Sequence, residues 1–483
     1  MQQQTLKHIP NTRPLARRFN SQHVAPISPF SYIHHDALSD VSKEQIAKQL
    51  KNLGPFPTYS NILNPQHFFQ NTVLLDYVKK KPHPVSLRQL AGFGNTLTKQ
   101  KIINSANFVR MELPIRLAIR IRDLQTLPFG VVNNYHLAQL YESYYHSFNA
   151  FRKIPQIQTI EENEKFCQTL STLLDDHMFN LSHLMMGALE VSIAESLPQD
   201  ELDSFMSSMM RSRISRRVIV EEHLSLSENY RKNPYAKKPP HYLGEIFQDC
   251  NAVDHFNQVF DNVKASFIER MPELKERFPA LELEGDLQCH FQFMVPHLHF
   301  MLHEILKNAV EATIQTHGKD SGHTNKLPPV KVTIIDSKKE VQMRISDQGG
   351  GLSHSTLQQV FSFGKNPTLA RKSLANFHQI PGLQLRSNLK VTAGGSSIIS
   401  SPSTGNGVEE NVYSTREKAS TLQELMSRPH EHTLGMGLPT CSVYADYWNG
   451  KLSMNSLDGY GSDTSLTLRK LGYHSNVIQL DRA

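Results

Sequence analysis

The sequence has few of the features that mark disulfide-stapled, zinc-bound or membrane-spanning proteins. Its 483 residues include only four cysteines, at 167, 250, 289 and 441. No two of them are close enough for a CxxC pair, so the spacing supports neither a zinc ribbon nor a disulfide framework. We expect each thiol to be a small buried hydrophobic group in a reducing compartment. No run of 18 or more apolar residues occurs, so no membrane-spanning helix is predicted.

Acidic residues are absent before Asp36. Residues 1–35 carry four of the net six positive charges, on Lys7, Arg13, Arg17 and Arg18. The rest of the chain is therefore nearly neutral, which argues against nucleic acid as a partner. An acid-free start with Arg, Gln, Asn and Ser resembles a mitochondrial transit peptide, and we expect 1–35 to be one. The alternative is an ordinary basic terminus.

The length predicts two or three domains. We expect residues 36–85 to be an extended lead-in. Residues 86–235 follow a helical pattern with short breaks, which predicts an up-and-down four-helix bundle. Its long helical stretches include 110–121, 135–152, 162–196 and 200–227. Residues 231–242 are basic and rich in proline, which is typical of a linker.

The second half of the chain changes to a mixed α and β pattern. Residues 330–336 and 340–347 alternate apolar and polar side chains around a short turn, which predicts a hairpin. Two more strands are expected at 451–456 and 464–468, so residues 250–475 are predicted to form an α/β sandwich in an α+β protein. Residues 367–434 have little apolar periodicity, and we interpret their middle as a mobile loop.

The segment 297–313 predicts a helix with one apolar side and an adjacent polar stripe. The stripe contains Glu304, Lys307, Asn308 and Glu311. The amide oxygen of Asn308 suits a Mg²⁺ ion carried by a triphosphate, and Glu304 could orient or deprotonate an attacking hydroxyl group. The alternative is a solvated helix face.

Three later segments place glycine where a backbone turn could approach a ligand. Asp347 ends a strand and could accept a hydrogen bond from an exocyclic amine such as adenine N6. Glycines before the helix at 440–449 would leave backbone N–H groups for phosphate oxygens. A tight turn at 459–464 enters the last strand, and ordinary turns are the alternative in each case. The residues concerned are Gly349, Gly351, Gly435, Gly437, Leu438 and Ser462.

The order of these four segments resembles the N, G1 and G2 boxes of the GHKL ATPases. That resemblance implies a Bergerat-type α/β sandwich with an ATP lid, here at 361–434. Residues 110–133, 213–223 and 435–463 further resemble the pyruvate dehydrogenase kinases and branched-chain α-ketoacid dehydrogenase kinases of mitochondria. The resemblance covers roughly 80–475, and the Tyr-Trp-Asn-Gly run at 447–450 is most like the fungal pyruvate enzymes.

The resemblance implies a matrix enzyme that uses ATP and Mg²⁺ to phosphorylate a serine of the decarboxylase alpha subunit of the pyruvate dehydrogenase complex. Docking on the lipoyl domain of the acyltransferase core and a homodimer, or pairing with a related kinase, are implied as well. The family's general base falls on Glu304, its magnesium ligand on Asn308, its N-box lysine on Lys307 and its adenine-binding aspartate on Asp347. The other nucleotide contacts fall on Gly349, Gly351, Gly435, Gly437, Leu438 and Ser462.

Several positions depart from the family pattern. Phe300 replaces the histidine that animal enzymes place one helical turn before the catalytic glutamate. His297 would lie about 10 Å away along the axis, and we expect His299 and His303 to point elsewhere. Glu311 replaces an arginine, and Thr433 replaces the first glycine of the G2 box. Without the animal enzymes' Asp-Trp tail, dimer coupling through it is not expected, and Trp448 is predicted to be core.

Three alternatives remain open on the sequence. The branched-chain complex is the other possible substrate. A sensor-type histidine kinase would need a phosphoacceptor, for which His177 is the nearest candidate, although we favour a structural or substrate-side role for it. An ATP-gated interaction protein would bind ATP without transferring phosphate to protein.

Overall fold

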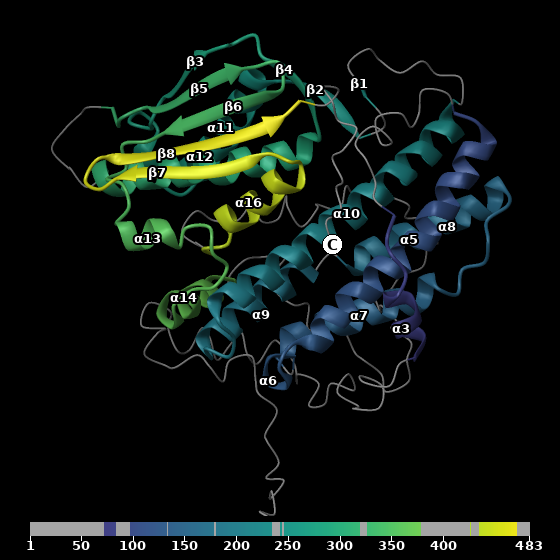
Figure 1. Ribbon diagram of the computed structural model, residues 1–483. Helices are drawn as coiled ribbons and strands as arrows, with labels where there is room; N and C mark the ends of the chain where they lie inside the picture. The colour runs from purple at the N-terminus through teal and green to yellow at the C-terminus, as the bar shows by residue number, and fades with distance from the viewer. Residues whose placement is uncertain are drawn as a thin grey trace, which may run out of the picture.

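The computed structural model describes most of two domains, an N-terminal helical domain and a C-terminal α/β domain (Figure 1). The expectations for 1–35, for most of the linker at 231–242 and for most of the stretch at 367–434 lie outside the described residues. Of the predicted linker, residues 231–232 end a helix and residue 242 begins a strand. The structure describes 72–83, 97–132, 134–177, 180–233, 242–243, 246–318, 326–377, 426 and 434–470.

The helical domain is built from α5, α7, α8, α9 and α10, with the short helices α3 and α6 at its edge. The side chain of Thr98 caps α5, and that of Asn134 caps α7 by accepting from two backbone N–H groups. The bounds are α3 Thr72–Val78, α5 Lys99–Thr126, α6 Phe129–Val132, α7 Tyr135–Phe151, α8 Ile160–Asp176, α9 Asn180–Ile193 and α10 Gln199–Lys232.

Two details of the helical prediction are wrong. The stretch 162–196 is not one helix, because α8 ends at Asp176 and a separate helix, α9, begins at Asn180. The expected extended lead-in contains the helix α3, which buries Leu74 against α5. A single buried side chain in seven residues gives too little apolar periodicity to predict such a helix.

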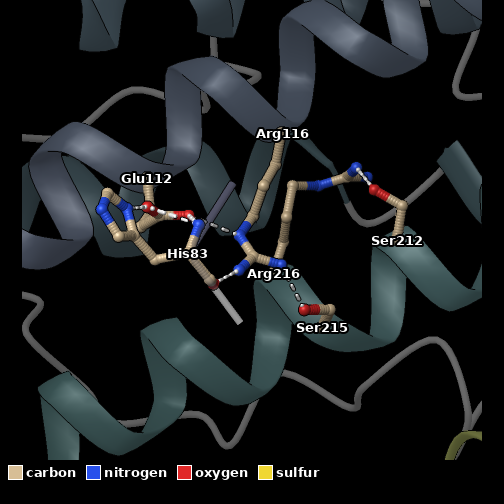
Figure 2. A network of polar contacts seen from close by, with 6 residues as sticks. All are labelled: His83, Glu112, Arg116, Ser212, Ser215 and Arg216. Atoms are coloured by element: carbon tan, nitrogen blue, oxygen red, sulfur yellow. Dashed lines mark hydrogen bonds and ion pairs between the residues drawn. The ribbon is translucent and has the colours of Figure 1, made fainter. Parts of the chain in front are cut away.

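A buried polar network fastens the segment after α3 to the bundle (Figure 2). Glu112 is fully buried and accepts hydrogen bonds from the backbone N–H of His83 and from Arg116 Nε at 3.2 Å. Arg116 also donates to the His83 carbonyl and to Ser215 Oγ, each at 2.8 Å. The network therefore joins α5, α10 and the segment that follows α3.

The α/β domain contains a five-stranded sheet in the order β3-β5-β6-β8-β7. Only β3 and β5 are parallel, and β5–β6 form the predicted hairpin with Val332 opposite Ile345. The strands are β3 Leu281–Gly285, β5 Val330–Asp336, β6 Glu340–Ser346, β7 Lys451–Leu457 and β8 Gly461–Arg469. All four predicted strands are thus confirmed. A smaller sheet joins β1 Tyr242–Leu243, β2 Phe247–Asn251 and β4 His290–Phe293.

Helices α11, α12 and α16 cover one face of the large sheet (Figure 1). Their bounds are α11 Ala252–Ile268, α12 Val295–His317 and α16 Gly437–Tyr447. Alternating strand residues such as Val332, Ile334 and Met343 are fully buried against them. This two-layer arrangement confirms the predicted α/β sandwich and holds α12 with its polar stripe between the sheet and α16.

Trp448 and three of the four cysteines lie in the core, as predicted. Trp448 is 2% exposed and packs edge-on against Phe247 and Phe293 of the small sheet. Cys250, Cys289 and Cys441 are buried, whereas Cys167 is only half-buried, with its Sγ 3.7 Å from His223 Nε2. No disulfide forms among these four thiols, which are all free.

The two domains meet along α10 and α9. Arg211 of α10 forms an ion pair with Asp446 of α16. Helix α14, Pro367–Phe377, follows the short helix α13, His354–Gln358, and packs on α9. The first part of the stretch 367–434, in which little apolar periodicity was recognised, is therefore helical, because Ala370, Leu374 and Phe377 form an apolar face that the bundle buries.

Candidate active site

The polar stripe of α12 is not a solvated face. Glu304 is 1% exposed and Lys307 is 3% exposed, while Asn308 is half-buried. The alternative interpretation of these residues as an exposed helix surface is therefore wrong. A carboxylate and an ammonium group are costly to bury without compensation, so their positions indicate a built site rather than chance.

Glu304 lies against the start of α16. A Cβ atom built on Gly437 would lie 2.0 Å from Glu304 Oε2, so only glycine leaves room for the carboxylate there. Gly437 is the first residue of α16, whose N-cap residue Met436 makes no side-chain cap. The carboxylate therefore lies at a helix start rich in backbone donors.

The histidine nearest to this carboxylate is His303, contrary to the expectation that it points elsewhere. His303 Nδ1 lies 3.7 Å from Glu304 Oε1, and the ring is 6% exposed. Neighbours on a helix diverge by about 100°, but both side chains extend into the same buried space. His297, in contrast, accepts a hydrogen bond from Trp448 Nε1 at 3.1 Å, and burial lowers its pKa to about 3. Phe300 is buried against Tyr444.

Asp347 forms a defined turn after β6. Its Oδ1 accepts from the backbone N–H of Gly349 at 2.8 Å and of Ser462 at 3.3 Å. Burial raises the pKa of this carboxyl group, and those two hydrogen bonds lower it. Within the described residues, Oδ2 makes no such contact, which leaves it for a ligand.

Glycine is required on both sides of this turn. A Cβ on Gly349 would lie 2.4 Å from the Ala312 Cβ of α12, and one on Gly351 would lie 2.1 Å from the Leu457 carbonyl oxygen. Ser462 Oγ lies 3.0 Å from Ser456 Oγ, which accepts from the Leu352 backbone N–H. The β7–β8 hairpin and the Asp347 turn are therefore packed backbone to backbone.

Helix α12 brings the two glycine segments into one site. Gly349 contacts it at Ala312 and Gly437 contacts it at Glu304, eight residues apart and so about 12 Å along the axis. Gly435 adopts a φ of +66°, and Leu438 is half-buried in the first turn of α16. The sequence-predicted site residues thus lie on α12, in the two glycine segments that contact it, or, for Ser462, on β8 beside Asp347. Thr433 lies outside the described residues.

Sequence reasoning missed the residue that fixes the segment after α13. Asp203 of α10 accepts from the backbone N–H groups of Phe363 and Gly364 at 2.6 and 2.9 Å, and from Ser362 Oγ at 2.7 Å. These partners are about 160 positions away in the chain, and an aspartate that follows other acidic residues near the start of a helix carries no signal of them.

His177 lies inside the helical domain. Its Nε2 is 2.6 Å from Ser147 Oγ, and its ring packs near Tyr144. Burial, followed by the charge of Arg216, lowers its pKa to about 3. It lines a pocket together with Arg213, Arg216 and Arg217. This position favours a structural or ligand-side role over that of an exposed phosphoacceptor.

The fold and the glycine-lined site define the class of protein: a helical bundle joined to a GHKL-type ATP-binding sandwich. A family model described as mitochondrial branched-chain alpha-ketoacid dehydrogenase kinase matches residues 84–247. Pyruvate dehydrogenase (acetyl-transferring) kinase 2, mitochondrial, of Saccharomyces cerevisiae is 38% identical over 92% of this chain and 94% of its own length. The chain therefore belongs to the family of mitochondrial pyruvate dehydrogenase kinases.

Similarity extends beyond fungi. The mitochondrial pyruvate dehydrogenase (acetyl-transferring) kinase of Arabidopsis thaliana is 26% identical over 80% of this chain and 90% of its own length. The corresponding kinase of Drosophila melanogaster is 24% identical over 82% of this chain and 84% of its own length. These matches span both domains, so the family assignment covers the helical bundle as well as the ATP-binding sandwich.

Proposed function

We propose that this protein is a mitochondrial serine kinase that phosphorylates the decarboxylase alpha subunit of the pyruvate dehydrogenase complex. The observation that carries the proposal is the position of the Glu304 carboxylate against Gly437, at the start of α16. A buried base beside a glycine turn with free backbone donors suits transfer of a phosphoryl group to a hydroxyl group. Membership of the kinase family supports the same reaction.

Adenine recognition is assigned to Asp347. Two backbone N–H groups hold its Oδ1, so Oδ2 has a fixed direction and can accept from an exocyclic amine. Gly349 and Gly351 would bring the backbone close to the base, and Ser462 lies beside Asp347 through its backbone N–H. Lys307, Gly435, Gly437 and Leu438 are assigned to the phosphate end, where backbone N–H groups and an ammonium group attract anions.

Magnesium would be held by Asn308. The half-buried amide lies one helical turn after Glu304 and offers a neutral oxygen of the kind that Mg²⁺ prefers. When bound, the ion would offset phosphate charge. Among the described residues no three His, Cys, Asp or Glu side chains converge as a metal site, and a single amide ligand fits an ion that arrives on the triphosphate.

The proton chemistry is assigned to Glu304. Its carboxylate would accept or orient the proton of the substrate serine while the helix start holds the phosphates. Burial among Gly437 and His303 excludes water from the carboxylate, so its direction is set by packing rather than by solvent. Positioning and electrostatics would supply most of the rate enhancement.

The helical domain is assigned to docking on the lipoyl domain of the acyltransferase core, and the functional unit to a homodimer or a pair with a related kinase. The matrix is the proposed location, since the relatives named above carry mitochondrial names and residues 1–35 resemble a transit peptide. None of the helices that the structure describes is long and apolar enough to cross a membrane.

The test is phosphate transfer from labelled ATP–Mg to purified pyruvate dehydrogenase complex and, separately, to branched-chain dehydrogenase complex. We expect acid-stable label on the pyruvate decarboxylase alpha subunit. Glu304→Gln should lose the label but keep ATP binding, because the amide cannot accept the proton. Glu340 is exposed and lies at the start of β6, the end of that strand away from Asp347. Glu340→Gln is therefore the matched control and should retain full transfer.

Each other outcome points to a different function. Label on the branched-chain subunit alone would select the substrate named by the matching family model. Acid-labile label on the kinase itself would establish a histidine kinase, and ATP binding without any transfer would establish an ATP-gated interaction protein. Any of the three would overturn the proposal as stated.

A further inference from the structure

Lys365 is a half-buried cation that the reaction described above does not use. It lies between α13 and α14, and its backbone N–H donates to Ser192 Oγ of α9 at 3.3 Å. Its ammonium group donates to the Ser362 carbonyl oxygen at 2.5 Å. Because an ammonium group has three donors, this single neutral acceptor leaves capacity for a further partner.

The backbone that carries Lys365 is held rigidly. Asp203 binds the two preceding backbone N–H groups, of Phe363 and Gly364, and also Ser362 Oγ. Gly364 has no space for a side chain, since a Cβ there would lie 2.7 Å from Gln199 Cγ. The backbone position of Lys365 is therefore fixed by contacts with the helical domain.

The side chain of Lys365 reaches the glycine turn before α16. A Cβ built on Gly435 would lie 3.5 Å from Lys365 Cε and 3.4 Å from Ser373 Oγ of α14. The same turn contacts Glu304 through Gly437. The ammonium-bearing side chain of Lys365 therefore lies beside Gly435, and the carboxylate of Glu304 lies beside Gly437. These glycines are two residues apart in one turn.

The charged surroundings of Lys365 favour an anionic ligand. Asp203 of α10 is the acidic group that acts on it, but the oxygens of that carboxylate already accept three hydrogen bonds from residues 362–364. Ser192 Oγ, which accepts the backbone N–H of Lys365, and Ser373 Oγ, which lies beside Gly435 as Lys365 Cε does, are both uncharged. Burial lowers the pKa of Lys365 to about 8, and an anion bound beside it would offset that cost.

We propose that Lys365 is a phosphate-binding residue, whose ammonium group contacts the phosphate groups of the bound nucleotide beside Gly435. This inference rests on the proposed function, because it takes the glycine turn as the phosphate site. It assigns the cation to the segment between α13 and α14, so the helical domain positions a nucleotide contact through Asp203. A purely structural lysine would instead only hold the Ser362 carbonyl.

The experiment compares the affinities of the full chain for ATP, ADP and adenosine. Lys365→Met should weaken ATP binding by about 10- to 100-fold, as expected for a charged hydrogen bond, and leave adenosine binding unchanged. Lys365→Arg should restore most of the ATP affinity. An equal loss for adenosine and ATP, or an unchanged ATP affinity in folded Lys365→Met, would overturn the proposal.

A second measurement separates a phosphate contact from a structural role. Calorimetric titration with ATP at pH 8, in two buffers of different ionisation enthalpy, should show proton uptake by the wild type, since the anion favours the charged lysine. Uptake should vanish in Lys365→Arg, which stays charged while still binding ATP. Uptake that persists in that variant would assign the proton to another group. If the chain has no nucleotide site, the wild type will bind neither ATP nor adenosine, whereas failure of phosphate transfer alone leaves these binding measurements unchanged.

Discussion

Glu304 and Gly437 occupy complementary space: the carboxylate of Glu304 fills the position that any side chain at residue 437 would take, 2.0 Å from its Oε2. Gly437→Ala should therefore displace the carboxylate, and saturating ATP offsets any loss of nucleotide affinity at Gly437 itself. We expect phosphate transfer to fall about 100-fold, as displacements near 1 Å do. Initial rates at saturating ATP measure this. Gly459→Asn is the control, because Gly459 has open space at its Cβ and asparagine tolerates its positive φ. Equal rates for the two variants would contradict the assignment.

Asp347→Asn should change the base preference of the site. The asparagine oxygen can keep the two backbone N–H bonds to Gly349 and Ser462, which leaves an NH₂ donor where Oδ2 stood. The NH₂ group of the asparagine and the exocyclic amine of adenine, both donors, would then face each other. The binding free energy of ATP should therefore weaken by about 1.5–3 kcal/mol. The 6-oxo group of GTP should be tolerated better than before. Equilibrium titrations with both nucleotides test this, and an unchanged ratio of ATP to GTP affinity would remove Asp347 from base recognition.

Glu190 should make stability depend on pH. Burial raises its pKa to about 8, while its hydrogen bond from Asn134 lowers it. In the unfolded chain the group ionises near 4.5, so the folded state holds its proton more tightly between these values. Its stabilising contribution is complete below the unfolded pKa and is lost as pH rises through about 8, by at most roughly 1.4 kcal/mol per pH unit.

Glu190→Gln should therefore flatten the decline of stability between pH 5 and 8. Urea unfolding at several pH values measures the free energy of unfolding. Burial lowers the pKa of His183 to about 4, so this side chain is neutral in the folded protein. On the acid side it should therefore have the opposite effect and make stability rise with pH. A decline of unchanged slope in the glutamine variant would exclude Glu190 as its source.

Removing one member of the Glu112–Arg116 pair should cost more stability than removing both. Each is at least 95% buried, so Glu112→Ala leaves an uncompensated buried guanidinium group, which costs about 3–5 kcal/mol. It also releases the backbone of His83 (Figure 2). Urea unfolding of both single variants and of the double variant measures the coupling. Additive losses would show that the two groups are independent, and proteolysis near Lys81 reports the released segment.

Local patterns predicted much of the fold. Strict alternation in β5 and β6 reflects one buried and one exposed sheet face, and Pro296 in the first turn of α12 marks where that helix begins. The short strands β2 and β4 escaped prediction, because four or five residues give too few repeats to separate a strand from a loop. The break after Asp176 was missed since the chain on both sides keeps a helical pattern.

The residues of the candidate site also fall into two groups, those that local patterns predict and those that depend on tertiary packing. Glu304, Asp347 and the glycines could be proposed because motif order reports local chemistry. The proximity of His303 to Glu304 depends on how neighbouring side chains share a buried space, which spacing alone does not determine. Asp203 depends on tertiary packing of α10 on residues 362–364, and no local pattern of the sequence encodes it.

Asp203 limits how freely the two domains can be exchanged between relatives. The carboxylate belongs to the bundle, yet it satisfies two buried backbone donors of the ATP-binding half. A chimaera whose bundle lacks an acceptor at this position would leave those donors unpaired, at about 1–3 kcal/mol each. Recombination within the family is therefore constrained by this carboxylate, and the bundle and sandwich must be inherited, or engineered, as one unit.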